Sequence, residues 1–185
     1  MAKTIAVIGA LDTKGEEFLF VKKEIEKRGH TALVINVGIV EGPGFEPDVP
    51  ADEVARAAGS SLAILKEKSD RGLAIETMSK GIAKVIVDLH TADRIQAVIA
   101  MGGSAGTEIG TAGMRALPLG VPKVMVSTLA SGDTKPYVGT RDIVMVPSIV
   151  DVAGINRISA QVYANAVGAV IGMVETPAPE IEEKP

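Results

Sequence analysis

The sequence predicts an α/β fold, a Rossmann-like three-layer sandwich with a mainly parallel sheet of about five or six strands. Short apolar runs such as residues 4–8 are typical of strands buried on both faces of a parallel sheet. They alternate with segments of helical periodicity, and the chain opens with a strand–helix–strand unit whose crossover is right-handed. The 185 residues suffice for one domain with its own core. We expect that domain at residues 1–175, followed by an acidic, proline-rich tail at 176–185.

The first half of the chain is expected to supply two strands and several covering helices. The glycines and prolines of residues 36–50 exclude helix and central strand, so a long loop is expected there. In order, the elements are a strand at 4–8, a turn at 9–17, a helix to about 28, a strand at 31–37, short helices at 51–58 and 61–68, and a helix at 70–89 with Ile75, Met78, Ile82, Val85 and Leu89 on its core face.

The second half is expected to supply the remaining strands, each followed by a turn rich in glycine or polar residues. The last helix carries small residues along a second face. In order, the elements are a strand at 98–101, a glycine turn at 102–107, a helix to 117, a strand at 121–126, a polar turn at 127–142, a strand at 142–146, and a helix at 156–174 with Ile158, Val162, Ala166, Ala169 and Met173 facing inward.

The glycine turn is the strongest indication of function in the sequence. It lies between a buried strand and a helix, an arrangement that presents unpaired backbone N–H groups to an anion. Gly102, Gly103 and Gly106 permit positive φ angles and close approach to a ligand. Ser104 and Thr107 can cap the helix or bind phosphate oxygens. The pattern therefore predicts an anion-binding site.

A second interpretation of these glycines is structural. Gly106, Gly110 and Gly113 fall at i, i+4 and i+7, so they form one smooth helical face. A glycine costs about 1 kcal/mol relative to alanine inside a helix, so three on one face indicate a compensating close contact. The partner in that contact is the sheet, another helix or a second protein.

The turn after the first strand carries Asp12, Thr13 and Lys14, at the edge where open α/β sheets bind ligands. Its spacing matches neither the P-loop nor the dinucleotide-binding fingerprint. Lys14 can nevertheless pair with phosphate, and Asp12 can hold Mg²⁺ directly or through water. The alternative is a helix N-cap formed by Asp12 or Thr13, with Glu16 nearby.

A third polar turn contains Ser131, Gly132 and Asp133, just past the carboxyl end of a strand. It suits a phosphate, a sugar hydroxyl or a hydrated metal ion, and an ordinary Asx turn is the structural alternative. Carboxylates that meet beside glycine turns suit Mg²⁺ on a nucleotide better than acid–base catalysis. Asp12 and Asp133 are therefore the candidate metal ligands, with Asp151 at the same expected edge.

Other kinds of site find little support. Residues 102–106 match the G-x-S-x-G nucleophile elbow, but the histidine of such a triad follows its serine, and both His30 and His90 precede Ser104. Two isolated histidines without a carboxylate pattern make a poor metal site. The absence of cysteine excludes disulfides, thiolate zinc sites and cysteine nucleophiles.

Composition narrows the partners and the compartment. The net charge of −4, the lack of a Lys/Arg run and an aromatic content of 3% argue against direct nucleic-acid binding. No apolar run approaches the ~20 residues of a membrane span, and the chain enters a strand at once, without the apolar core of a signal peptide. We expect a cytoplasmic protein that contacts neither membrane nor nucleic acid.

Five segments taken together resemble one known family. They are ALDTKGEE, VGIVEGPGFEPDVPADEVARAAG, GGSAGT, STLASGDTKPYVGTRDI and PSIVDVAGIN, in that order within residues 3–175. The chain is similar to the N-terminal domain of the tomato mosaic virus resistance protein family, which has plant, bacterial and archaeal members. The resemblance implies a Rossmann-like ATP-binding domain that uses Mg²⁺ and is often dimeric. It also implies nucleotide binding at Asp12, Thr13, Lys14, Gly102, Gly103, Ser104, Gly106, Thr107, Ser131, Gly132 and Asp133.

The chain departs from this family in two respects. Family members are usually about twice as long, with a C-terminal half that resembles phosphoenolpyruvate-mutase-type barrels, and they often carry an acid where Asn36 stands. In the plant protein this domain engages a viral replication protein, a role that does not transfer to the present chain.

We therefore expect MgATP binding at the carboxyl edge of the sheet, in a regulatory or partner subunit of a two-part protein. The expected partners are the nucleotide, further copies of the chain and a separate C-terminal-half subunit. Two alternatives stand beside this one. The first is a non-catalytic assembly subunit that uses the Gly106/Gly110/Gly113 face or the small-residue C-terminal helix. The second is half of an enzyme that acts on a phosphorylated or carboxylated metabolite.

Overall fold

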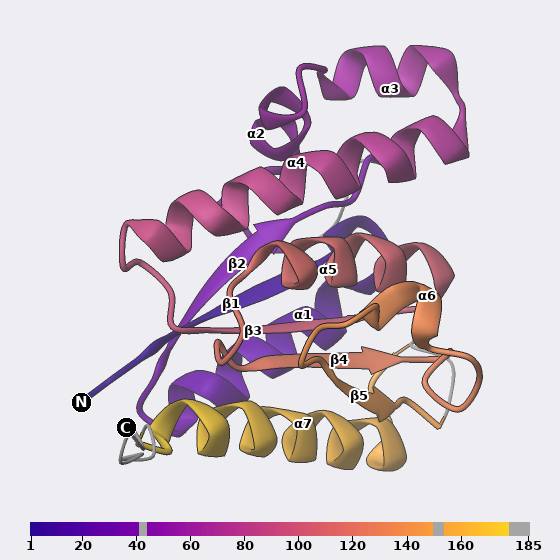
Figure 1. Cartoon of the computed structure of the whole chain (residues 1–185). Coiled ribbons are helices and arrows are strands. Elements are labelled where there is room, and N and C mark those ends of the chain that lie inside the picture. The colour runs from indigo at the N-terminus through magenta and orange to yellow at the C-terminus, as the bar shows by residue number, and fades with distance from the viewer. Residues whose placement is uncertain (41–43, 150–153, 178–185) are drawn as a thin grey trace.

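A five-stranded sheet forms the centre of the computed structural model, which describes residues 1–40, 44–149 and 154–177 (Figure 1). Its strands are β1 (Thr4–Gly9), β2 (Thr31–Asn36), β3 (Ala97–Gly102), β4 (Lys123–Ser127) and β5 (Val144–Pro147). The strand order is β2-β1-β3-β4-β5, and every neighbouring pair is parallel. The predicted fold class is therefore confirmed. Most of the expected tail, residues 178–185, lies outside the described residues.

Helices cover both faces of the sheet and complete the three layers (Figure 1). In the described residues they are α1 (Leu11–Lys27), α2 (Ala51–Ala57), α3 (Leu62–Lys68), α4 (Arg71–Thr91), α5 (Ser104–Ala116), α6 (Lys135–Val138) and α7 (Arg157–Glu175). One core lies between the sheet and α1 with α7, around Phe18 and Tyr163. The other lies between the sheet and α2, α4 and α5, around Met78 and Ile82. Strand residues alternate between these cores, which explains the continuous apolar runs.

The helix α1 begins earlier than the sequence predicts. A turn was expected at 9–17, whereas only Ala10 separates β1 from α1. The Oδ1 atom of Asn36 accepts a hydrogen bond from the Leu11 N–H at 3.1 Å and so satisfies the first donor of the helix. Lys14 then interrupts the helix with φ −140° and ψ 30°. The prediction was wrong because the group that stabilises this start comes from the end of β2.

The buried face of α7 is also rotated from the one predicted. Ile158 is 53% exposed and Ala169 is exposed, although both were expected to face inward. An N-terminal capping box, in which Asn156 and Ser159 exchange hydrogen bonds, places Ser159 in the interior. Small residues all around this helix make its apolar pattern ambiguous. The buried residues are Ser159, Tyr163, Ala166, Val167, Val170 and Ile171.

The glycine face of α5 packs inside the molecule. A Cβ atom added at Gly110 would lie 2.8 Å from the Ala100 Cβ, and one added at Gly113 would lie 3.2 Å from the Ile82 Cγ1. Both distances are tighter than normal packing, so the glycines let α5 approach the sheet and α4 closely. The structural interpretation of this face is therefore correct, and the face is not available to a second protein.

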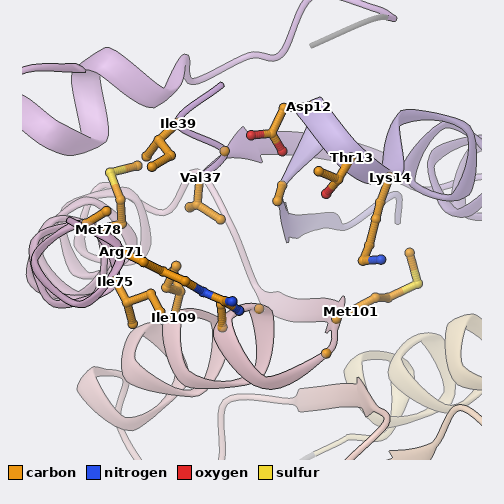
Figure 2. Close-up of a pocket in the computed structure, with 17 residues that line it drawn as sticks. Asp12, Thr13, Lys14, Val37, Ile39, Arg71, Ile75, Met78, Met101 and Ile109 are labelled. Carbon is orange, nitrogen blue, oxygen red and sulfur yellow. The ribbon is translucent and has the colours of Figure 1, made fainter. Parts of the chain in front are cut away.

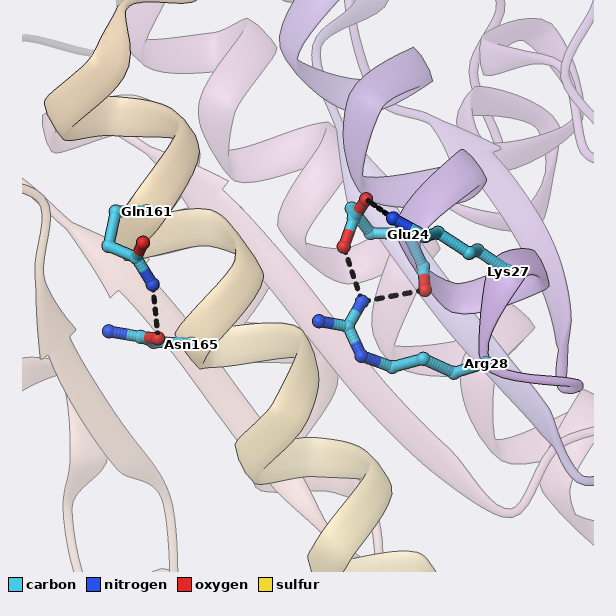
Figure 3. A network of polar contacts seen from close by, with 5 residues as sticks. All are labelled: Glu24, Lys27, Arg28, Gln161 and Asn165. Atoms are coloured by element: carbon cyan, nitrogen blue, oxygen red, sulfur yellow. Dashed lines mark hydrogen bonds and ion pairs between the residues drawn. The ribbon is translucent and has the colours of Figure 1, made fainter.

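The outer faces of α1 and α7 differ in charge (Figure 3). At the C-terminal end of α1, the guanidinium of the C-cap residue Arg28 contacts the Glu24 carboxylate at 2.5 Å, and Lys27 lies 3.8 Å from the same side chain. On α7, the polar contact is uncharged, from Gln161 to Asn165 at 2.9 Å. Residues 158–174 contain no charged side chain. Even so, no helix in the described residues is both long and apolar enough to cross a membrane.

A buried lysine holds the amino end of β4. Lys123 is fully buried, and its Nζ donates to the carbonyls of Pro118 and Val121 and to the Asp142 carboxylate at 2.9 Å. Burial raises the pKa of Asp142. Hydrogen bonds from Lys123 and from the Gly120 N–H, together with the lysine charge, outweigh this effect, so the pKa lies below its usual value.

This ion pair predicts an acid-sensitive contribution to stability. Because the folded-state pKa of Asp142 is the lower one, the contribution is present above the ordinary carboxyl pKa of about 4 and is lost as the pH falls through the folded value. The carboxylate is 42% exposed, so we expect Asp142→Asn to cost only on the order of 1 kcal/mol at pH 7. Urea unfolding at pH 7 and pH 3 measures this, and a cost that stays constant between the two pH values contradicts it.

Candidate functional site

The strand order places a topological switch point between β1 and β3. The chain leaves β1 for α1 on one face of the sheet and leaves β3 for α5 on the other. In doubly wound sheets of this order, the two diverging connections leave a crevice at the carboxyl ends of the strands, where ligands bind. The parallel register also brings the turns after β1, β3 and β4 to this same edge.

A cavity of about 420 Å³ occupies this crevice (Figure 2). Four segments line it: the start of α1, the residues after β2, the start of α4, and the turn from β3 into α5. Apolar side chains supply much of the wall, with Val37 and Ile39 on one side and Ile75, Met78 and Ile109 on another. A neighbouring cavity of about 430 Å³ shares Ile39 and Arg71 with the first. The volume suits a small organic ligand.

The start of α5 presents free backbone donors to the cavity. Its N-cap is Gly103, which has no side chain to cap the helix, and the first N–H bonded to this residue is that of Thr107, at 2.8 Å. For the N–H groups of residues 104–106, no acceptor lies among the described residues. Ala105 and Gly106 line the cavity. The positive end of the helix dipole therefore opens onto this space.

The three glycines of this turn have different roles. A Cβ atom at Gly102 would lie 2.8 Å from the Gly106 Cα, and one at Gly106 would lie 3.3 Å from the Met101 carbonyl oxygen. Both residues therefore allow α5 to pack against the end of β3. A Cβ atom at Gly103 would meet only the Thr128 Oγ1, at an ordinary 3.7 Å, and its φ of −80° suits any residue. Internal packing therefore does not require glycine at position 103.

Asp12 joins two walls of the cavity. Its Oδ2 accepts a hydrogen bond from the Val40 N–H at 3.0 Å, while its Oδ1 is buried without a hydrogen-bond partner in the described structure. Gly38 permits this contact, because a Cβ atom there would lie 2.5 Å from the carboxylate. Asn36 is outside the lining, and its Oδ1 is engaged by the N–H groups of Leu11 and Gly38. It supports the turns instead of facing a ligand.

Two cations enter the cavity from opposite sides. Figure 2 shows Lys14 extending from α1 toward Met101, and Arg71 extending from α4 past Ile75 and Ile109. The sequence predicts Lys14 as a site residue but not Arg71. The one feature that could have indicated Arg71 is its position as the first residue of a helix, where the helix dipole disfavours a cation.

Six of the predicted site residues line the cavity, namely Asp12, Thr13, Lys14, Gly102, Gly103 and Gly106. Thr107 is fully buried, and its hydroxyl lies 2.6 Å from the Ser127 hydroxyl. Ser104 is exposed at the first position of α5 and is outside the lining. It also does not have the positive φ of a strained turn, which weakens the nucleophile-elbow interpretation further.

The turn at Ser131, Gly132 and Asp133 also lies outside the lining and is exposed. The Asp133 Oδ1 accepts a hydrogen bond from the Lys135 N–H at 3.0 Å, as in an Asx turn. Thr128, which precedes this turn in the chain, lies closer to the glycine turn, because its N–H donates to the Gly102 carbonyl at 3.3 Å. No cluster of three or more potential metal ligands occurs within the described ranges. Of the two described candidates, Asp12 is the one that faces this cavity, and Asp151 lies outside the described residues.

The topology and the cavity define a class: a doubly wound parallel α/β domain with a ligand-sized crevice at its switch point. The chain belongs to the family described as "Uncharacterised protein family (UPF0261) N-terminal domain", whose sequence profile matches residues 3–179. The match covers nearly all of the chain and confirms the resemblance at the level of the family.

Its relatives include bacterial and plant proteins. A UPF0261 protein of Clostridium tetani is 51% identical over 186 residues, which cover 100% of this chain and 46% of the relative. A UPF0261 protein of Rhizobium meliloti is 44% identical over 183 residues, which cover 99% of this chain and 45% of the relative. The ToMV resistance protein Tm-1(GCR237) of Solanum lycopersicum is 46% identical over 182 residues, which cover 90% of this chain and 24% of the relative. The chain thus spans less than half the length of these curated relatives.

Proposed function

We propose that this domain binds MgATP in the switch-point cavity, with the phosphates against the start of α5. The uncapped N-terminus of α5 carries the proposal. The N–H groups of residues 104–106 have no acceptor in the described structure, and Gly103 beside them leaves space that internal packing does not require. Helix N-termini of this kind bind phosphate through unpaired donors and the helix dipole.

The remaining walls suit the other parts of a nucleotide. Ile39, Ile75, Met78 and Ile109 offer apolar surface for a planar base. Lys14 supplies a charge for a phosphate group. The Ser131–Asp133 turn and Ser104 are weaker candidates for contact with the nucleotide, because neither lines the cavity.

Asp12 fits a magnesium-binding role. In nucleotide sites Mg²⁺ is held by one or two carboxylates, water and the phosphates themselves, so one carboxylate is sufficient. When bound, the ion neutralises phosphate charge. Asp12 would hold it with the Oδ1 atom, which lacks a hydrogen-bond partner in the described structure. Asp133 meets this requirement less well, because its carboxylate already accepts the Lys135 N–H.

We further propose that nucleotide binding serves a larger assembly. The curated relatives are more than twice as long as the part that this chain matches. Among the described residues, the cavity offers binding groups and no histidine or other clear general base, which suits a regulatory or partner role in such an assembly. The runner-up is half of an enzyme for a phosphorylated or carboxylated metabolite, for which the same donors at α5 would bind the anionic group.

Isothermal titration calorimetry with ATP and MgCl₂ tests the proposal. We expect saturable binding with a Kd below about 1 mM, equivalent to a free energy of about −4 kcal/mol or better. The matched titration without Mg²⁺ should be weaker, since Asp12 would hold the ion and the ion would neutralise phosphate charge. Absence of both heat and a thermal shift at millimolar nucleotide rejects ATP as the ligand.

A further inference from the structure

Arg71 lines the same cavity as the glycine turn, although the two are remote in sequence. It is the first residue of α4 and lines the cavity opposite the start of α1. Figure 2 shows its side chain crossing the apolar wall between Ile75 and Ile109, so that its guanidinium reaches into the cavity. Lys14 enters from the other side, with its ammonium near Met101.

The dipole of α4 disfavours an arginine at this position, which is exposed to solvent. A cation in the first turn of a helix opposes the helix dipole. The neighbouring Asp70 carboxylate already caps α4 by accepting the Leu73 N–H at 3.0 Å. Arg71 forms no ion pair with a carboxylate of the described residues. It therefore differs from Arg28, the C-cap residue of α1, and Arg56 of α2, which form ion pairs with Glu24 and Asp52.

The surroundings add positive potential. Lys14 and the free N–H groups of α5 face the same cavity, and Asp12 is the one carboxylate among the described lining residues. The chain as a whole carries a net charge of −4. The described lining residues thus carry two cationic side chains and one carboxylate, in a protein that is acidic overall, which favours an anionic ligand.

We propose that Arg71 is a specificity-determining residue that makes the site selective for ligands with two or more linked phosphates. This inference rests on the proposed function. A guanidinium binds phosphate oxygens in a bidentate manner, whereas an ammonium acts as a point charge. With Arg71 on one side of the cavity and the α5 donors beside it, linked phosphates can reach both groups at once, while Lys14 adds a positive charge to the same lining. A monophosphate or a single carboxylate satisfies fewer of them.

The test compares ATP, ADP and AMP, each with Mg²⁺, on the wild-type protein and on Arg71→Gln and Arg71→Lys. We expect Arg71→Gln to weaken ATP binding about 10-fold to 100-fold and AMP binding less than about 3-fold, because AMP lacks the phosphates that Arg71 contacts. Arg71→Lys keeps the positive charge but loses the bidentate geometry of the guanidinium, so its ATP affinity should lie between those of the wild-type protein and Arg71→Gln. A purely structural role would affect the three nucleotides equally.

Arg157→Gln is the matched control. Arg157 is also an exposed arginine at the first position of a helix, α7, but it does not line the cavity. The control should leave all three affinities unchanged. If the wild-type protein binds none of the nucleotides, the proposed function fails. If it binds ATP but Arg71→Gln weakens all three nucleotides equally, or none of them, the Arg71 inference is overturned while nucleotide binding stands.

Discussion

Replacing Gly103 with aspartate is expected to weaken MgATP binding at least about 100-fold, equivalent to about 3 kcal/mol, while leaving the domain folded. The new carboxylate would occupy the space next to the free N–H groups of residues 104–106, where it would both exclude and repel a phosphate. The fold should tolerate the change, because Gly103 has a φ of −80° and its added Cβ meets only the Thr128 Oγ1 at 3.7 Å. Calorimetry measures the affinity, and thermal unfolding reports on the fold.

A matched variant separates charge from position. Gly168→Asp introduces the same side chain on the exposed face of α7, where an added Cβ has no neighbour within 4 Å. This variant should bind MgATP as tightly as the wild-type protein. Equal loss of affinity in both variants would show that overall charge, and not the start of α5, controls binding. Unchanged MgATP affinity in Gly103→Asp would show that the phosphates do not bind at this turn.

Gly81→Ala is expected to lower the free energy of unfolding by about 2 kcal/mol or more. Gly81 is where α4 crosses α2, and an added Cβ would lie 2.9 Å from the Val54 carbonyl carbon and closer still to its oxygen. A backbone carbonyl cannot rotate away as a side chain can, so α2 must shift from α4. The gain of about 1 kcal/mol in helix propensity offsets only part of this cost. Urea unfolding at 25 °C measures the difference.

The control for this prediction has the opposite sign. Gly168→Ala makes the same substitution inside a helix where nothing lies within 4 Å. We expect it to stabilise the protein by about 0.5–1 kcal/mol through helix propensity alone. If Gly81→Ala also stabilises the protein, α2 and α4 are not in the close contact that the structure describes.

Much of the architecture follows from local patterns in the sequence. Continuous apolar runs such as residues 4–8 identify strands buried on both faces, and the strand–helix alternation requires parallel connections. The glycine turn and the Asp12–Lys14 segment were both assigned to the carboxyl edge, and they line one cavity there. The fold prediction is confirmed, and it was possible because hydrophobic periodicity and turn chemistry depend on residues close together in the chain.

Helix ends and helix faces were less predictable. The start of α1 depends on Asn36, whose Oδ1 accepts a hydrogen bond from the Leu11 N–H. Asn36 lies at the end of β2, so the residues around Leu11 do not reveal this contact. The rotation of α7 depends on its capping box and on Tyr163, because a helix rich in alanine, glycine and valine has apolar residues on every side. In both cases, the contacts that decide the structure are not visible in the local spacing of apolar residues.

By itself, the sequence determined the layered parallel sheet, the order of its elements and the edge at which polar turns gather. Only the tertiary structure decided which polar groups reach a ligand. It buried the Thr107 hydroxyl against Ser127, engaged Asp133 in its own turn, and brought Arg71 from α4 to the cavity. The physical reason is that a cavity wall is assembled from segments distant in the chain, so exposure and charge at the site depend on packing between elements.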